Sequence, residues 1–202
     1  SIGVVEATGR IIIKPSWNKT RARDRGKIVL HIDPKMSFGT GHHESTRLSL
    51  TLLERYIEPN ADVLDFGTGT GILAIAAVKL GARRVTAIDY DEWSIPNARE
   101  NIKKNGARRN IRLVRGTAKA IPRTKFNLAI ANIDYPTIVD SLPKLLAAVR
   151  HEGILILSGL LLSDLNALFD TFRHKSALPL ELVTENGWAA LALLKCGTKG
   201  SP

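Results

Sequence analysis

The spacing of hydrophobic positions changes along the chain and predicts stretches of different structure. Before residue 33 the apolar residues form short β-branched runs, at 10–13 and 28–32, which is typical of strands joined by a polar, basic segment. Proline and glycine at 33–41 predict a loop. From about 43 to 56 the apolar positions recur at the helical period, which predicts one amphipathic helix.

From residue 62 onward, short apolar runs alternate with longer stretches, two of them closed by glycines. We expect strands at 62–66, 84–89, 111–115, 127–132 and 153–157. We expect helices at 71–80, 93–105 and 137–149, and from Ser163-Asp164 to about 173. Such alternation predicts a parallel sheet with helices on both faces.

The last two predicted strands break this alternation. They span 180–184 and 188–195 and are separated only by Glu185, Asn186 and Gly187. Asn-Gly favours a tight hairpin turn, so these strands are expected to be antiparallel. The predicted fold is therefore α/β: a seven-stranded, doubly wound, mostly parallel sheet with an antiparallel C-terminal hairpin. This Rossmann-like layout is that of class I methyltransferases, whereas a dinucleotide-binding sheet would end with another crossover.

Length and composition set the organisation of the chain. Its 202 residues suit one domain with a small appendage. We expect a short N-terminal β segment and lid loop at 1–42, a methyltransferase domain at 43–196 and a disordered tail at 197–202. No apolar run approaches a membrane span, residues 1–10 lack the layout of a signal peptide, and the single cysteine, Cys196, excludes an internal disulfide. A cytoplasmic protein is predicted.

The chain carries an unusually large positive charge. A formal net charge of +10 indicates attraction to an anionic partner. Proximity to RNA is one explanation, and a solvated surface on a basic protein is the other. Aromatic residues make up only 5% and do not interleave with the basic ones, so a platform for stacking single strands is not expected. Two clusters hold many of the basic residues: Lys14, Lys19, Arg21, Arg23, Arg25 and Lys27, then Lys103, Lys104, Arg108, Arg109, Arg112 and Arg115.

The candidate chemistry lies after the first strand of the predicted sheet. Gly67, Gly69 and Gly71 follow that strand, and a backbone without side chains lets a ligand approach the helix N-terminus. Asp89 closes the next strand, where a carboxylate can accept hydrogen bonds from both hydroxyls of a ribose. The sequence therefore predicts a pocket for an adenosine-containing cofactor.

The residue before the glycines favours one cofactor. Asp65 would repel the pyrophosphate of a dinucleotide but suits an ammonium group. S-adenosylmethionine carries an ammonium and no phosphate, so a methyltransferase is favoured over a dehydrogenase. No G-K-[ST] follows a glycine at the distance of a phosphate-binding P-loop. Asp65 can alternatively brace the glycine turn.

Four sequence segments then point to a family. They are D-P-K-M-S-F-G-T-G-H-H-E-S-T at 33–46, G-I-L-A-I-A-A-V-K-L-G-A at 71–82, A-N-I at 131–133 and L-I-L-S-G-L-L at 155–161. In this order they resemble motifs of the PrmA family, whose members methylate the eleventh protein of the large ribosomal subunit. The resemblance runs from about residue 11 to 195.

The chain departs from the family pattern in three places. H-H-E-S at 42–45 stands where T-H-P-T is more usual, and Asp134 stands where leucine is usual. PrmA proteins also carry an N-terminal domain that presents the ribosomal protein, for which we expect no room here. The resemblance thus implies a PrmA-like catalytic domain that methylates a lysine or N-terminal amine of a ribosomal or other protein. An RNA or small-molecule acceptor, and a non-catalytic ribosome- or RNA-binding module, are the alternatives.

The resemblance also implies roles for residues. Asn132 ends a strand at the ligand-binding edge, and its carboxamide can orient the acceptor amine or the cofactor tail, although a strand-end turn role is the alternative. Thr40, in the expected lid at 38–41, would offer a hydroxyl to that tail, although a plain connecting loop is the alternative. One of the adjacent histidines, here His43, would help to remove a proton from the acceptor amine. Adjacent histidines point apart and no H-E-x-x-H is present, so no metal is expected. The expected catalytic residues are Asn132, Thr40 and His43; the expected cofactor-binding residues are Thr46, Asp65, Gly67, Gly69, Gly71, Asp89, Thr117 and Asn132.

Overall fold

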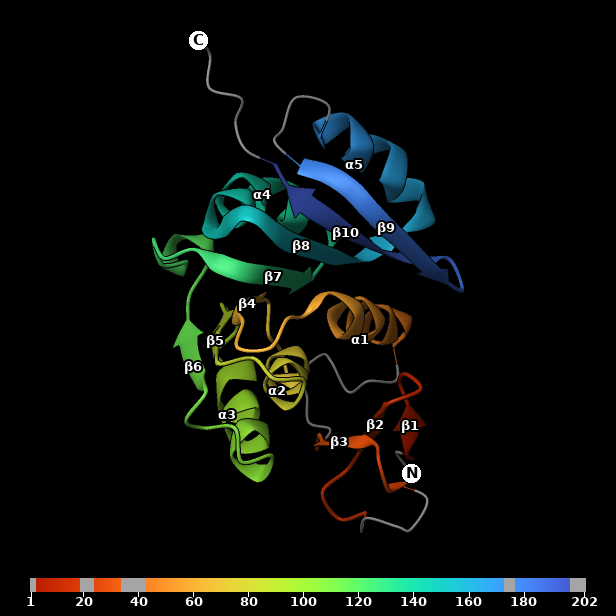
Figure 1. Cartoon of the computed structure of the whole chain (residues 1–202), viewed down its shortest axis with the longest axis vertical. Helices are drawn as coiled ribbons and strands as arrows, with labels where there is room; N and C mark the ends of the chain where they lie inside the picture. Colours follow the sequence, from red (N-terminus) through yellow and green to blue (C-terminus); the bar gives the residue numbers. More distant parts are fainter. Residues whose placement is uncertain (1–2, 19–23, 34–42, 173–176, 197–202) are drawn as a thin grey trace.

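The computed structural model describes residues 3–18, 24–33, 43–172 and 177–196 (Figure 1). The expected lid, with Thr40, and the expected tail at 197–202 lie outside these residues, as do Lys19, Arg21 and Arg23 of the first basic cluster. In the described part of the chain, no helix is both long enough and apolar enough to cross a membrane.

The main sheet has seven strands in the order β6-β5-β4-β7-β8-β10-β9. Strands β4 to β8 pair in parallel, and β10 pairs antiparallel with both β8 and β9. The predicted fold, including the C-terminal hairpin, is therefore confirmed. The strands are β4 (Asp62–Phe66), β5 (Arg84–Asp89), β6 (Ile111–Arg115), β7 (Phe126–Asn132), β8 (Val149–Leu161), β9 (Ala177–Glu185) and β10 (Trp188–Lys195).

Helices cover both faces of this sheet (Figure 1). One face packs against α1 (Glu44–Tyr56), α2 (Ile72–Lys79) and α3 (Ser94–Lys104), and the other against α4 (Tyr135–Ala148) and α5 (Leu165–Phe172). Helix α2 is apolar on every side and is buried at six of its eight positions, which is typical of a helix enclosed by other elements.

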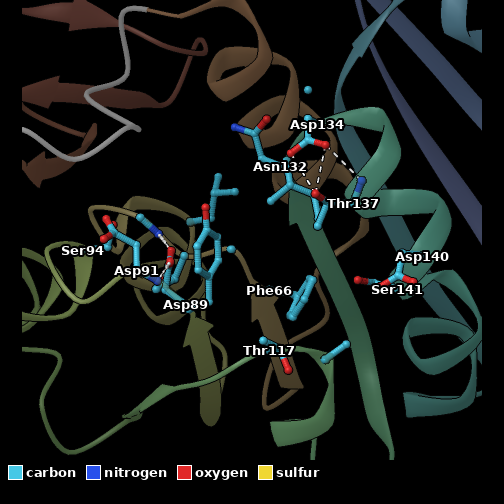
Figure 2. Close-up of a pocket in the computed structure, with 18 of the residues that line it drawn as sticks. Phe66, Asp89, Asp91, Ser94, Thr117, Asn132, Asp134, Thr137, Asp140 and Ser141 are labelled. Atoms are coloured by element: carbon cyan, nitrogen blue, oxygen red, sulfur yellow. Dashed lines mark hydrogen bonds between the residues drawn. The ribbon is translucent and has the colours of Figure 1, made fainter.

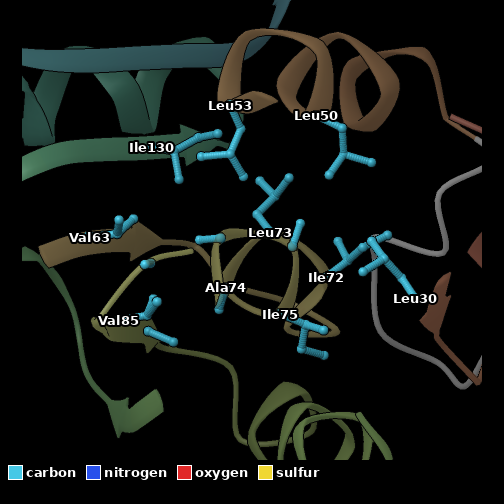
Figure 3. Close-up of a cluster of buried hydrophobic side chains, with 14 of the residues drawn as sticks. Leu30, Leu50, Leu53, Val63, Ile72, Leu73, Ala74, Ile75, Val85 and Ile130 are labelled. Carbon is cyan, nitrogen blue, oxygen red and sulfur yellow. The ribbon is translucent and has the colours of Figure 1, made fainter. Parts of the chain in front are cut away.

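Figure 3 shows how α2 fills the hydrophobic core on the face of the sheet that α1, α2 and α3 cover. Leu73 and Ala74 lie between α1, which contributes Leu50 and Leu53, and the strands of the sheet. Leu50 and Leu53 are fully buried. Burial of one leucine side chain contributes about 1.5–3 kcal/mol, so this contact stabilises the glycine turn that precedes α2.

Two predicted strands are longer in the structure. The apolar run at 153–157 is the centre of β8, which extends from 149 to 161, and 180–184 extends to 177–185. Ladder pairing continues beyond the predicted runs and includes polar residues such as Ser158 and Glu185, because backbone hydrogen bonds do not require apolar side chains. Helix α4 begins two residues earlier than predicted, where Asp134 caps it by accepting from the Thr137 N–H at 3.0 Å.

The N-terminal segment forms a separate three-stranded sheet of β1 (Val5–Glu6), β2 (Ile11–Lys14) and β3 (Ile28–His31). Strand β1 was not among the sequence predictions, and β2 pairs with β3 in parallel. Ile11, Ile13 and Leu30 join the same core as α1 and α2. This contact attaches the small sheet to the main one, and a domain division at residue 42 stays a prediction.

Two asparagines, Asn101 of α3 and Asn105 at its C-cap, hold the small sheet in place. The Asn105 carboxamide accepts from the His31 N–H at 3.0 Å and donates to the His31 carbonyl at 2.7 Å. Asn101, fully buried, accepts from the Asp33 N–H at 3.2 Å and donates to the Thr70 carbonyl at 3.0 Å. Because Thr70 belongs to the glycine turn, Asn101 joins that turn to the end of the N-terminal sheet.

Candidate active site

A cavity of about 800 Å³ opens where the parallel strands of the main sheet end (Figure 2). Figure 2 shows Asp89 and Asp91 on one side of it, and Asn132, Asp134 and Thr137 on another. Carboxyl ends of parallel strands are the usual place for ligands in open α/β sheets. Six of the expected site residues line the cavity: His43, Gly67, Gly69, Asp89, Thr117 and Asn132.

Asp89 is held in place by the backbone around it. Its Oδ2 accepts from the Gly69 N–H at 2.7 Å, and its Oδ1 accepts from the Asp91 N–H at 2.9 Å. The two carboxylate oxygens offer about four lone-pair directions, so two stay available to a ligand. The next residue, Tyr90, also lines the cavity and is 74% exposed, which leaves its ring accessible to a flat ligand group.

The glycine turn owes its shape to backbone angles that side chains disfavour. Gly67 and Gly71 have φ of 77° and 81°. A Cβ on Gly67 would lie 2.3 Å from Cγ2 of Ile133, whereas one on Gly71 would lie 3.5 Å from Cβ of Ala98. Gly67 therefore keeps the floor of the cavity clear, and Gly71, which does not line the cavity, serves the approach of α2 to α3.

Replacing Gly67 by alanine is expected to destabilise the chain. A left-handed backbone costs an L residue about 1–2 kcal/mol, and the clash with Ile133 adds overpacking of similar size. Adding Ile133→Ala removes the Cγ2 atom that clashes. The double variant should therefore regain the stability lost to the clash and still lack the stability lost to the left-handed backbone. Urea unfolding of the single and double variants measures both; equal stability of Gly67→Ala and the native chain would contradict this account.

Asp65 lies beneath the turn rather than in the cavity. It is fully buried and does not line the cavity. Its Oδ2 accepts from Thr68 Oγ1 at 2.5 Å and from the Ala74 N–H at 3.0 Å, so the carboxylate joins the turn to the first turn of α2. Its Oδ1 is buried with no hydrogen-bond partner among the described residues. These contacts support the bracing role, and a role in cofactor binding stays a prediction.

Burial, with a smaller contribution from the nearby charge of Asp89, raises the pKa of Asp65 to about 7, against the lowering effect of the two hydrogen bonds. The folded chain therefore binds this proton at pH values where the unfolded chain, with a pKa of 3.8, has released it. Between these values the free energy of unfolding falls as the pH rises, by up to about 4 kcal/mol for roughly three pKa units.

The variant Asp65→Asn lacks this titration and keeps an oxygen for Thr68 and Ala74. We expect it to be more stable than the native chain at about pH 8, with an advantage that shrinks towards about pH 4. Thermal unfolding over a pH series measures the difference. If the two chains lose stability in parallel as the pH rises, Asp65 is not the titrating group. A large loss of cofactor affinity in this variant would instead support direct contact with the ligand.

Asn132 reaches the cavity from the end of β7. Its Nδ2 is 3.5 Å from Thr46 Oγ1, and its Oδ1 is buried without a hydrogen-bond partner in the described part of the chain. Thr46 itself is fully buried and does not line the cavity. Thr46 thus holds one end of the Asn132 carboxamide, while the Oδ1 of this cavity-lining residue stays free to accept a hydrogen bond.

His43 also lines the cavity and caps the N-terminus of α1. Its Nδ1 accepts from the Ser45 N–H at 3.2 Å and is 2.8 Å from Ser45 Oγ. Its ring meets that of Trp188 edge to face, with centroids 4.4 Å apart. Trp188, which also lines the cavity, was not found from the sequence, because only the antiparallel pairing of β10 with β8 brings it here.

Other lining residues were also missed. Asp134, the N-cap of α4, and Asp140, within that helix, are both exposed and line the cavity. Nothing local in the sequence marks them, apart from the position of Asp134 two residues after Asn132. Thr117 lines the cavity near Lys119, from whose N–H it accepts at 3.4 Å. Among the described residues, no group of three His, Cys, Asp or Glu side chains is placed to hold a metal ion.

The sheet order, the antiparallel hairpin and the glycine turn facing Asp89 define a class I methyltransferase fold. The family described as Ribosomal protein L11 methyltransferase (PrmA) matches residues 4–195. The chain belongs to this family, which confirms the resemblance seen in the sequence.

Curated relatives carry the same family name. Ribosomal protein L11 methyltransferases of Acetivibrio thermocellus and Caldicellulosiruptor saccharolyticus are 36% and 38% identical to this chain over 92% and 93% of its length. The chain spans 59% and 61% of these two relatives. A crystal structure of ribosomal protein L11 methylase from Lactobacillus delbrueckii subsp. bulgaricus is 30% identical, with a TM-score of 0.90 over 97% of this chain and 100% of that one.

More distant structures share the fold. An rRNA methylase from Streptococcus thermophilus is 17% identical, with a TM-score of 0.62 over 77% of this chain and 99% of that one. At this identity the likeness concerns the arrangement of strands and helices, and it does not bear on the acceptor.

Proposed function

We propose that this chain uses S-adenosylmethionine to methylate an amine nitrogen of a ribosomal protein, on a lysine side chain or at an N-terminus. The observation that carries the proposal is the unpartnered Oδ1 of Asn132, which lies in the same cavity as Asp89 and the glycine turn. One cavity can therefore hold an adenosine cofactor and offer an acceptor for an N–H group. The family membership supports methyl transfer.

The residues present fit the cofactor. Asp89 would accept from the ribose hydroxyls, since its two backbone donors leave lone pairs available. Gly67 leaves space for the methionine part, and Tyr90 and Thr117, which also line the cavity, would flank the adenine. When bound, S-adenosylmethionine supplies a methyl group on a positively charged sulfur, which needs no further activation.

The protein's part is then to place and prepare the acceptor nitrogen. Asn132 would accept one N–H of the amine, which fixes the direction of the nitrogen lone pair. His43, whose ring is fixed by Ser45 and Trp188, would help to take up the proton. Asp134 and Asp140 at the cavity would attract a cationic lysine-bearing segment. A lysine with a pKa of about 10.4 must lose its proton first, so the rate should rise towards alkaline pH.

Transfer of labelled methyl from S-adenosylmethionine into a host-cell extract tests the proposal. We expect label that is lost on protease treatment and that migrates with a small ribosomal protein. Label lost on ribonuclease treatment would instead make RNA the acceptor. Cofactor binding, measured in parallel by calorimetry, separates a missing acceptor from a chain that binds no cofactor; the latter result would overturn the proposal.

A further inference from the structure

A second cavity, of about 330 Å³, lies at the amino ends of the parallel strands, opposite the ends that form the active site. It is formed where β4, β5 and β6 begin and where the chain enters β7. Arg84 and Asp89 are the first and last residues of β5, and Arg84 lines this cavity while Asp89 lines the active site. At about 3.3 Å per residue, the strand separates the two by roughly 17 Å. We call the second cavity the basic groove.

Its charge is strongly one-sided. Four cationic side chains line it, Arg84, Arg109, Arg112 and Lys125, against one carboxylate, Asp62. Asp62 is engaged by two guanidiniums, Arg83 at 2.8 Å and Arg84 at 3.0 Å.

The remaining cations of the basic groove carry no compensating charge. Arg109 and Arg112 are exposed, and no acidic side chain among the described residues pairs with either. Within the described ranges, Lys125 donates only to the Ala147 carbonyl. Exposed Arg108 and Arg123 extend the charge around it. An anionic partner would therefore meet guanidiniums that no protein carboxylate neutralises.

We propose that the basic groove binds the phosphodiester backbone of RNA. Guanidinium forks match phosphate oxygens in a bidentate geometry, and three of the four cations are arginines. A protein partner would need apolar or aromatic anchors, but none of the exposed large hydrophobic side chains of the described residues lines the groove. Its one aromatic residue, Phe126, is 4% exposed, so bases have no ring to stack on. The partner that fits is a duplex recognised through its phosphates.

The position of the basic groove leaves the active site open. Because the basic groove and the active site lie at opposite ends of the parallel strands, one chain can hold an RNA duplex and a methyl acceptor at once. RNA binding needs neither the cofactor nor the acceptor, so this inference goes beyond the proposed function and stands apart from it.

Fluorescence anisotropy of a short labelled RNA duplex of generic sequence, titrated with the full chain over a range of salt concentrations, tests the inference. Arg109→Glu combined with Arg112→Glu should lower the affinity at least about tenfold and reduce the slope of log K against log salt by about two. The charge-matched control combines Arg10→Glu with Lys27→Glu, which directly precede β2 and β3 of the N-terminal sheet, across the view from β6 in Figure 1. It changes the net charge equally and should keep the native slope.

Three results would overturn the inference. They are absence of salt-dependent binding by the native chain, equal losses in the two double variants, and displacement of the duplex by polyglutamate as effectively as by unlabelled duplex. Arg109→Gln with Arg112→Gln, checked by thermal unfolding, repeats the test with a milder change. Asp89→Ala should bind the duplex like the native chain while losing methyl transfer, so failure of one proposal is distinguished from failure of the other.

Discussion

Asp89→Ala is expected to lower the affinity for S-adenosylmethionine by at least about a hundredfold, which corresponds to roughly 2.7 kcal/mol. The change removes the acceptor for two ribose hydroxyls, and hydrogen bonds to a charged group are worth about 1.5–3 kcal/mol each. It also leaves the N–H groups of Gly69 and Asp91 without their acceptor, which loosens the glycine turn. Isothermal titration calorimetry with the cofactor and its demethylated product measures the loss.

The control for this result is Asp140→Ala. Asp140 also lines the cavity but is exposed, and it lies at α4 rather than beside the glycine turn. Its removal should change cofactor affinity little, because an exposed carboxylate contributes little across water. Asp89→Asn keeps one acceptor oxygen, so its cofactor affinity should lie between those of Asp89→Ala and Asp140→Ala. Similar affinities in Asp89→Ala and Asp140→Ala would mean that Asp89 does not hold the ribose.

Asn132→Ala is expected to lower the rate of methyl transfer about a hundredfold at saturating cofactor and acceptor. The unpartnered Oδ1 is the group that can align the acceptor nitrogen, and loss of alignment has effects of this size. Cofactor affinity should change much less than the rate, because Asp89 and the glycine turn remain. Single-turnover transfer of labelled methyl to purified acceptor gives the rate, and calorimetry gives the affinity.

Two further variants make this result specific. Asn132→Asp keeps an oxygen at the same place and should recover part of the rate. Thr46→Val removes the hydroxyl 3.5 Å from Asn132 Nδ2 and should cause a smaller loss of rate, since Thr46 only supports the carboxamide. If Asn132→Ala weakens cofactor affinity as much as it lowers the rate, then the carboxamide holds the cofactor tail rather than the acceptor.

The fold was predictable because its signals are local. Alternating strand and helix periods, glycines that end helices and the Asn186-Gly187 turn each depend on residues close together in the chain. Most errors concern the ends of elements such as β8, where pairing with a distant strand extends the ladder past the apolar run. The short strand β1 was missed, because two residues carry no periodicity.

The basic clusters show the limit of reading charge along a sequence. Lys104 and Arg115 belong to one cluster with Arg109 and Arg112. In the structure Lys104 pairs with Asp33 and Arg115 with Glu92, while Arg109 and Arg112 face the basic groove. Which cations remain available to a partner depends on carboxylates brought close by folding.

For the active site, the sequence by itself determined the glycine turn and Asp89, because left-handed backbone angles and strand ends are local properties. The tertiary structure alone decided which neighbours of these residues reach the cavity. Successive side chains of a strand point to opposite faces, so Phe66 lines the cavity while Asp65 is buried below it. Trp188 arrives only through pairing of β10 with β8. The carboxamide of Asn132 is held through its Nδ2 by Thr46, 86 residues earlier, which leaves the buried Oδ1 without a partner among the described residues.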